Sequence, residues 1–66
     1  MFSKGDLLYV PQSAVLYGLS QNSICVNKQP SLALFVKYVD EGFVKVVLDG
    51  KQWLIKNREV YLNHGG

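Results

Sequence analysis

The dipeptide Asp49-Gly50 constrains the fold most strongly, because it stands between two apolar, β-rich runs at residues 43–48 and 51–56. Asp-Gly is favoured in two-residue hairpin turns, since a type I′ turn needs a positive φ at both central positions. This turn places Val46 opposite Trp53 and makes one face of the hairpin almost wholly apolar. The other face is mixed, as expected for an antiparallel sheet that is buried on one side.

A third strand is predicted at residues 32–39, joined to Phe43 by the turn Asp40-Glu41-Gly42. Three-residue hairpin loops favour a glycine where the chain turns left-handed, and Gly42 fits that position. Pairing Val39 with Phe43 then decides which side chains of the strand face the core. The predicted inward set is Leu32, Leu34, Val36 and Tyr38, and the predicted outward set is Ala33, Phe35, Lys37 and Val39.

The rest of the chain predicts shorter strands and no helix, because apolar residues recur with a period of two and not of 3.6. Strands are expected at residues 7–10 and 60–62, with a long irregular connection at 11–31 that contains short apolar runs. Residues 57–59 form a one-turn break before the last strand. The predicted fold is all-β and five-stranded, with a single domain at residues 1–62 and a flexible tail at 63–66.

Length, charge and cysteine content limit the number of domains, the cellular location and the kinds of partner. Sixty-six residues make one domain, near the lower size limit for folding without disulfides. The single cysteine, Cys25, excludes an intrachain disulfide and favours a reducing, cytoplasmic location; its apolar neighbours predict a buried, inert thiol. The net charge of +2 permits an anionic partner without requiring one. No membrane span or signal peptide is predicted.

Catalytic chemistry is not predicted. His64 is the only histidine and lies in the tail, and the five acidic residues are scattered apart from Asp40 and Glu41 in a turn. No nucleophile–base pair and no group of metal ligands has suitable spacing. We therefore expect a protein that is not an enzyme and that needs no cofactor, metal or small-molecule substrate.

Three segments of the chain carry a resemblance to a known fold. They are Phe2-x-x-Gly5-Asp6-x-Leu8-Tyr9-Val10, then Val44-x-Val46-x-Leu48-Asp49-Gly50-Lys51-x-Trp53-x-Ile55, then Val60-Tyr61-Leu62. In this order they resemble the SH3-like small β-barrels, among them Tudor, KOW and retroviral integrase C-terminal domains. The resemblance implies a five-stranded barrel. The integrase-like members make nucleic acid a plausible partner, whereas the acidic loop and the groove motifs of proline-binding SH3 domains are missing here.

The leading functional hypothesis is a small accessory or regulatory protein that binds a protein partner or a second copy of itself. It depends on apolar side chains that the predicted registers place on the outer face of the sheet. The candidates for this protein-binding surface are Phe35, Val47, Leu54 and Phe43.

The alternative hypothesis is a nucleic-acid interface on the same outer face. The registers set Lys37 directly opposite Lys45 and place Lys56 across from Phe43. Like charges opposed on a sheet repel each other, and a phosphate backbone would relieve that repulsion. Lysines interleaved with Phe35 and Phe43 also fit the combination of charge and stacking that binds single strands.

Trp53 and the C-terminal Gly65-Gly66 each have a structural and a functional interpretation. Trp53 is predicted to fill the core. The alternative is an aromatic cage for a cationic ligand, formed with Tyr9, Tyr17, Tyr38 or Tyr61. The C-terminal Gly65-Gly66 is similar to the end of ubiquitin-like sulfur carriers, which is a remote alternative because those folds need a helix that this sequence does not predict.

Overall fold

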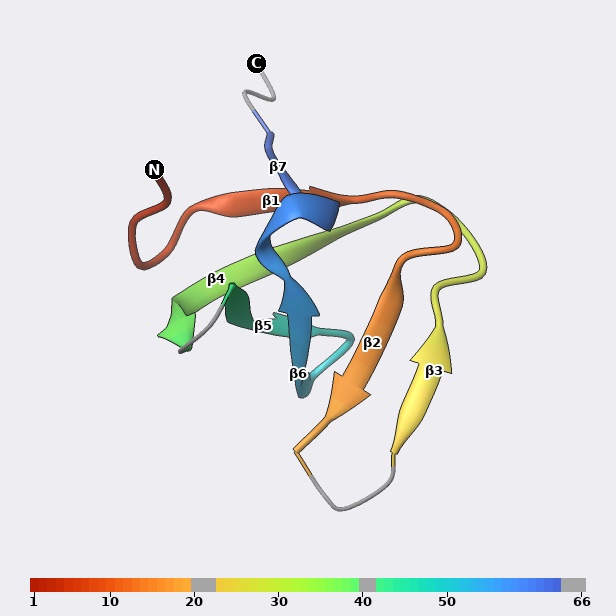
Figure 1. The fold of residues 1–66 in the computed structure, drawn as a ribbon. Coiled ribbons are helices and arrows are strands. Elements are labelled where there is room, and N and C mark those ends of the chain that lie inside the picture. Colours follow the sequence, from red (N-terminus) through yellow and green to blue (C-terminus); the bar gives the residue numbers. More distant parts are fainter. Residues whose placement is uncertain (20–22, 40–41, 64–66) are drawn as a thin grey trace.

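The computed structural model describes residues 1–19, 23–39 and 42–63, which form one antiparallel sheet of seven strands (Figure 1). The prediction of an all-β fold is confirmed. The elements are β1 (Leu7–Val10), β2 (Val15–Gly18), β3 (Ile24–Val26), β4 (Ser31–Val39), β5 (Phe43–Leu48), β6 (Lys51–Lys56), the 3-10 turn η1 (Asn57–Glu59) and β7 (Tyr61–Leu62). Their order across the sheet is β3-β2-β6-β5-β4-β1-β7. In the described segments, no helix has the length and apolar character needed to cross a bilayer.

The β5–β6 hairpin has the predicted turn and register. Asp49 and Gly50 have φ of +53° and +77°, so both central residues of the turn are left-handed. Val46 faces Trp53 across the hairpin, as the turn requires. Gly42 has a φ of +87°, which is the left-handed position predicted at the end of the β4–β5 connection.

The β4–β5 pair follows the predicted register only in part. Lys37 faces Lys45 as expected, but the register shifts between Phe35 and Lys37, so that Phe35 faces Val46. One extra residue, Val36, therefore stands in β4 as a β-bulge. A bulge turns every side chain beyond it to the opposite face of the sheet.

The predicted faces of residues 32–35 are wrong as a consequence. Ala33 and Phe35 point inward and are buried, whereas Leu32 and Leu34 are exposed on the outer face. The ring of Phe35 lies 5.6 Å from that of Phe2 and 5.0 Å from that of Tyr38, centroid to centroid. Because of the bulge, Leu32 and Leu34 lie on the surface, and the ring of Phe35 is buried in their place within an aromatic cluster.

The predicted irregular connection at residues 11–31 contains a hairpin, β2–β3, so the five-stranded count is not confirmed. β2 joins the meander by pairing with β6, where Gly18 faces Trp53. On the other side of β2, a Cβ on Gly18 would lie 2.5 Å from the Cβ of Ser23, so the close approach of Ser23 requires glycine here. The sheet is open in the part of the chain that the structure describes, because its end strands β3 and β7 are not paired with each other.

The inner face of the curved sheet holds a single core. Trp53 is half-buried and packs against this core, as does Phe2. The buried apolar side chains are Leu8, Val10, Ala14, Leu16, Ala33, Phe35, Val44, Val46, Leu48, Ile55 and Val60.

Asn27 is a buried polar residue at the point where the chain crosses from β1 to β2. Its Nδ2 atom donates hydrogen bonds to the carbonyl oxygens of Val10, at 3.1 Å, and Pro11, at 3.0 Å. The Ser31 hydroxyl donates to the Oδ1 atom of Asn27 at 3.4 Å, and the backbone N–H of Asn27 donates to the Ala14 carbonyl. One side chain therefore joins the end of β1 to the start of β4, and its own buried polar atoms find partners there.

Candidate binding surfaces

The outer face of the sheet carries two regions of different chemistry. Directly opposed residues in antiparallel strands point to the same side, so the registers identify which side chains are neighbours there. One region spans β7, β1, β4 and β5, and the other spans β4, β5, β6 and β2.

The first region, called here the apolar face, consists of two rows of side chains. In one row Leu7 faces Leu34, which in turn faces Val47. In the other row Tyr9 lies between Tyr61 of β7 and Leu32 of β4. The members of the apolar face are Leu7, Tyr9, Leu32, Leu34, Val47 and Tyr61.

No member of the apolar face carries a charge, although five of the six are exposed. The tyrosine rings of Tyr9 and Tyr61 lie 6.5 Å apart and extend the surface across the β1–β7 edge. A contiguous apolar surface that crosses four neighbouring strands differs from singly scattered leucines, which need no explanation.

The second region, called here the lysine–aromatic face, includes the predicted lysine pair. Lys37 is opposite Lys45, and Lys45 is opposite Leu54. Tyr17 of β2 follows Leu54 in the same row. Its ring meets that of Phe43 edge to face, with centroids 5.5 Å apart. The members of this face are Tyr17, Lys37, Phe43, Lys45, Leu54 and Lys56.

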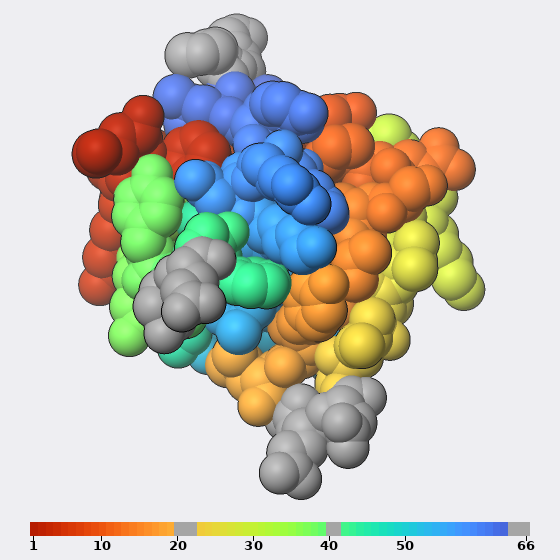
Figure 2. Space-filling model, in the orientation of Figure 1, coloured from red at the N-terminus to blue at the C-terminus, as the bar shows by residue number. Residues whose placement is uncertain are grey.

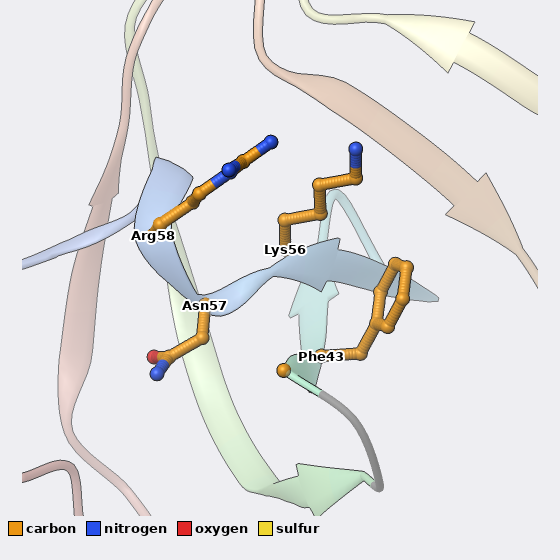
Figure 3. Close-up of a pocket in the computed structure, with 5 residues that line it drawn as sticks. Phe43, Lys56, Asn57 and Arg58 are labelled. Atoms are coloured by element: carbon orange, nitrogen blue, oxygen red, sulfur yellow. The ribbon is translucent and has the colours of Figure 1, made fainter.

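A hollow of about 350 Å³ lies at one end of the lysine–aromatic face, where β6 passes into η1. It is lined by Phe43, Lys56 and Arg58 together with Gly42 and Asn57. The side chains of Lys56 and Arg58 extend to the same side as the ring of Phe43, whereas Asn57 points the opposite way (Figure 3). Two cations and an aromatic ring thus share one opening.

The predicted protein-binding residues do not form one site. Phe35 is only 3% exposed and belongs to the core, so its prediction as a surface residue is wrong. The other three are half-buried: Val47 lies in the apolar face, and Leu54 and Phe43 lie in the lysine–aromatic face.

The structure does bring together the predicted nucleic-acid residues. Lys37 is exposed, and Lys45 and Lys56 are half-buried. Phe35 does not lie beside these lysines, because it is buried in the core. In its place stands Tyr17, which was predicted only as a candidate for the aromatic cage and whose pairing with β6 no local turn predicts.

Three further predictions have different outcomes. Trp53 packs on the inner face, whereas Tyr9, Tyr17 and Tyr61 lie on the outer face, so these three do not form a cage with it. The fourth cage candidate, Tyr38, packs its ring against Phe2 and Phe35. The prediction of a buried thiol is wrong, because Cys25 is exposed on the edge strand β3. Gly65 and Gly66 lie outside the described residues. Within the described ranges, no three His, Cys, Asp or Glu side chains gather into a potential metal site.

Comparison with known proteins gives no match to a protein-family model, to a curated protein or to a solved structure.

Proposed function

We propose that this protein is a non-catalytic binding module that acts as a small accessory or regulatory subunit by docking its apolar face on a protein partner. The observation that carries the proposal is the uncharged apolar surface that crosses β7, β1, β4 and β5. Its burial would contribute about 25 cal/mol for each Å² of apolar surface removed from water.

The backbone beneath the apolar face favours binding. All six side chains stand on strands that are paired within one sheet, so docking orders few additional backbone torsions. The aromatic members Tyr9 and Tyr61 are of the residue type that is enriched in protein interfaces. The apolar face has six members, whereas a standard interface has about 20–30 residues a side, so we expect a partner bound weakly or with help from a second surface.

We also propose a relation to the SH3-like small barrels and a cytoplasmic location. The meander β4–β5–β6, the single turn η1 and the return of β7 to β1 support the first proposal. The β2–β3 hairpin would then be an elaboration of the long first connection. The single cysteine supports a reducing compartment.

Replacing Leu32 with aspartate is expected to weaken partner binding at least tenfold, because it places a charge in the apolar face, opposite Tyr9. Proteins captured from lysate of the native host, after nuclease treatment and at high salt, would be identified by mass spectrometry. The candidate would then be purified and its dissociation constant measured by calorimetry against both the wild type and Leu32→Asp.

Leu19→Asp is the matched control, because Leu19 and Leu32 are both 50% exposed and Leu19 lies outside the apolar face. The control should bind like the wild type. Equal loss of affinity in both variants, or loss of every captured protein after nuclease treatment, would contradict docking through the apolar face.

A second candidate function is binding of single-stranded nucleic acid by the lysine–aromatic face. Two observations favour it: Lys37 and Lys45 are directly opposed, and the edge-to-face pair Tyr17–Phe43 lies beside them. Lys56 and Arg58 bring two more cations to the same end of the sheet. Charge beside aromatic rings is the general arrangement of single-strand binding surfaces.

The double variant Lys37→Glu/Lys45→Glu is expected to lower affinity for a fluorescein-labelled oligothymidylate at least tenfold in anisotropy titrations at low salt. Wild-type affinity should fall as salt rises, because phosphate contacts release counterions. Lys4→Glu/Lys28→Glu is the control, since both double variants change the net charge from +2 to −2. Equal losses in the two variants would show that only net charge matters, and this candidate would be abandoned.

A further inference from the structure

The edge strand β3 lacks the features that usually protect a sheet edge from pairing with another chain. It lies at the margin of the molecule, coloured yellow in Figure 2, and it is the last strand of the sheet. Its three residues are Ile24, Cys25 and Val26, none of them charged and none of them proline. Ile24 is 65% exposed and Val26 is 52% exposed. Natural edges are commonly blunted by lysine, proline or a bulge.

The backbone of β3 has hydrogen-bonding groups directed away from the sheet. The Gly18 N–H donates to the Ser23 carbonyl at 2.6 Å, which identifies Gly18 and Ser23 as a hydrogen-bonded pair. Such pairs alternate with non-bonded pairs along antiparallel strands, so Cys25 bonds to β2 and its two neighbours do not. The N–H and C=O groups of Ile24 and Val26 therefore point outward at the edge.

We propose that β3 pairs with β3 of a second copy of this chain, in an antiparallel arrangement with its twofold axis at Cys25. Ile24 of each copy then faces Val26 of the other. These are two hydrogen-bonded pairs, and each exchanges two backbone hydrogen bonds, four in all. The two sheets join into one continuous sheet across the axis. This self-pairing uses the β3 edge and is independent of the apolar face.

The charge distribution favours a second copy as the occupant. A twofold axis brings identical residues together, so a charge near the axis would face its own copy. Residues 24–26 are uncharged, and the nearest described charge, on Lys28, would lie beyond the paired segment. A three-residue edge buries much less area than a stable dimer needs, so the dimer is weak and reversible.

The proposed register gives the thiols a distinctive geometry. Opposed residues of a non-bonded antiparallel pair have Cα atoms about 4.5 Å apart, which lies within the range that a disulfide spans. Cys25 would face its own copy at such a position. Its side chain also lines a hollow of about 500 Å³ beside Leu16 and Trp53, which leaves space for a second thiol.

Oxidation by diamide tests the register. Diamide takes two electrons and two protons from the two thiols and leaves one disulfide between the chains. We expect rapid conversion of the wild type to a covalent dimer on non-reducing gels. We also expect the amide resonances of Ile24 and Val26 in the reduced protein to shift as its concentration rises. Resonances that do not change with concentration would overturn the proposal.

Val26→Pro removes an outward N–H while leaving the bonds of Cys25 to β2 intact, and it should slow cross-linking at least tenfold. Val26→Thr is the matched control, since it retains the N–H and the branched shape, and it should cross-link like the wild type. Circular dichroism checks that each variant is folded. The rate at which Cys25 of each variant reacts with a small disulfide reagent is used to correct its cross-linking rate for thiol reactivity. Equal rates for Val26→Pro and the wild type would overturn the proposal.

A charge exchange gives a second, independent test. Ile24→Lys/Val26→Lys and Ile24→Glu/Val26→Glu should each cross-link slowly alone, because like charges then face each other. An equimolar mixture of the two should cross-link at least tenfold faster than either, and a mixture no faster than its components would contradict the register. Leu32→Asp should leave cross-linking unchanged, so failure of this dimer and failure of the apolar face are distinguishable.

Discussion

Replacing Phe35 with alanine is expected to lower the free energy of unfolding by about 3–5 kcal/mol, the usual cost of emptying a buried aromatic site. The ring is 3% exposed and lies against Phe2 and Tyr38, so its removal leaves a cavity in the core. A domain of this size has little stability in reserve, since single domains have only about 5–15 kcal/mol in total. Urea denaturation followed by tryptophan fluorescence measures the loss.

Phe43→Ala is the matched control for this substitution, because Phe43 is half-buried on the outer face. We expect it to cost much less stability than Phe35→Ala. Had β4 continued without its bulge, Phe35 would stand on the outer face and the two substitutions would cost about the same. Equal costs in the experiment would therefore contradict the position of the bulge.

Replacing Asn27 with aspartate is expected to cost about 2–4 kcal/mol, because it removes a buried donor and places a carboxylate against carbonyl oxygens. The Nδ2 atom lies 3.1 Å and 3.0 Å from the carbonyl oxygens of Val10 and Pro11. Aspartate has almost the same shape, so the substitution tests the hydrogen bonds and not the packing. Chemical denaturation at neutral pH gives the difference in unfolding free energy.

Asn57→Asp makes the same chemical change at an exposed position in η1, and we expect it to alter stability by less than about 0.5 kcal/mol. A similar small effect for Asn27→Asp would mean that the connection between β1 and β2 does not depend on this side chain. Amide hydrogen exchange at Ser13 and Asn27 provides a local readout, since the Ser13 N–H donates to the Asn27 carbonyl.

The parts of the fold that the sequence predicted are those fixed by a short turn. Asp49-Gly50 determines the whole β5–β6 register, because two residues suffice to set the pairing of the strands that they join. The Lys37–Lys45 pair was predictable for the same reason, since it lies on the turn side of the bulge. The lysine–aromatic face could therefore be assembled largely from sequence.

The bulge could not be predicted because residues 32–36 are apolar on both faces. Either register buries a row of apolar side chains, so the alternation in the sequence does not distinguish them. In the observed register Phe35 meets Phe2 in the core, and this contact between residues distant in sequence is one that no local pattern predicts. The bulge places Leu32 and Leu34 on the outer face, where they form part of the apolar face. Because the sequence did not predict the bulge, it did not predict the apolar face either.

The order of the strands has a consequence for folding during synthesis. β1 and β2 are made before the other strands, yet β2 pairs with β6 as well as with its neighbour β3, and β1 lies between β4 and β7. The partners β4, β6 and β7 are thus made later, and closing such long loops costs conformational entropy before it yields contacts. The meander β4–β5–β6 needs only short turns, so we expect it to form first and to act as the template on which the N-terminal third of the chain assembles.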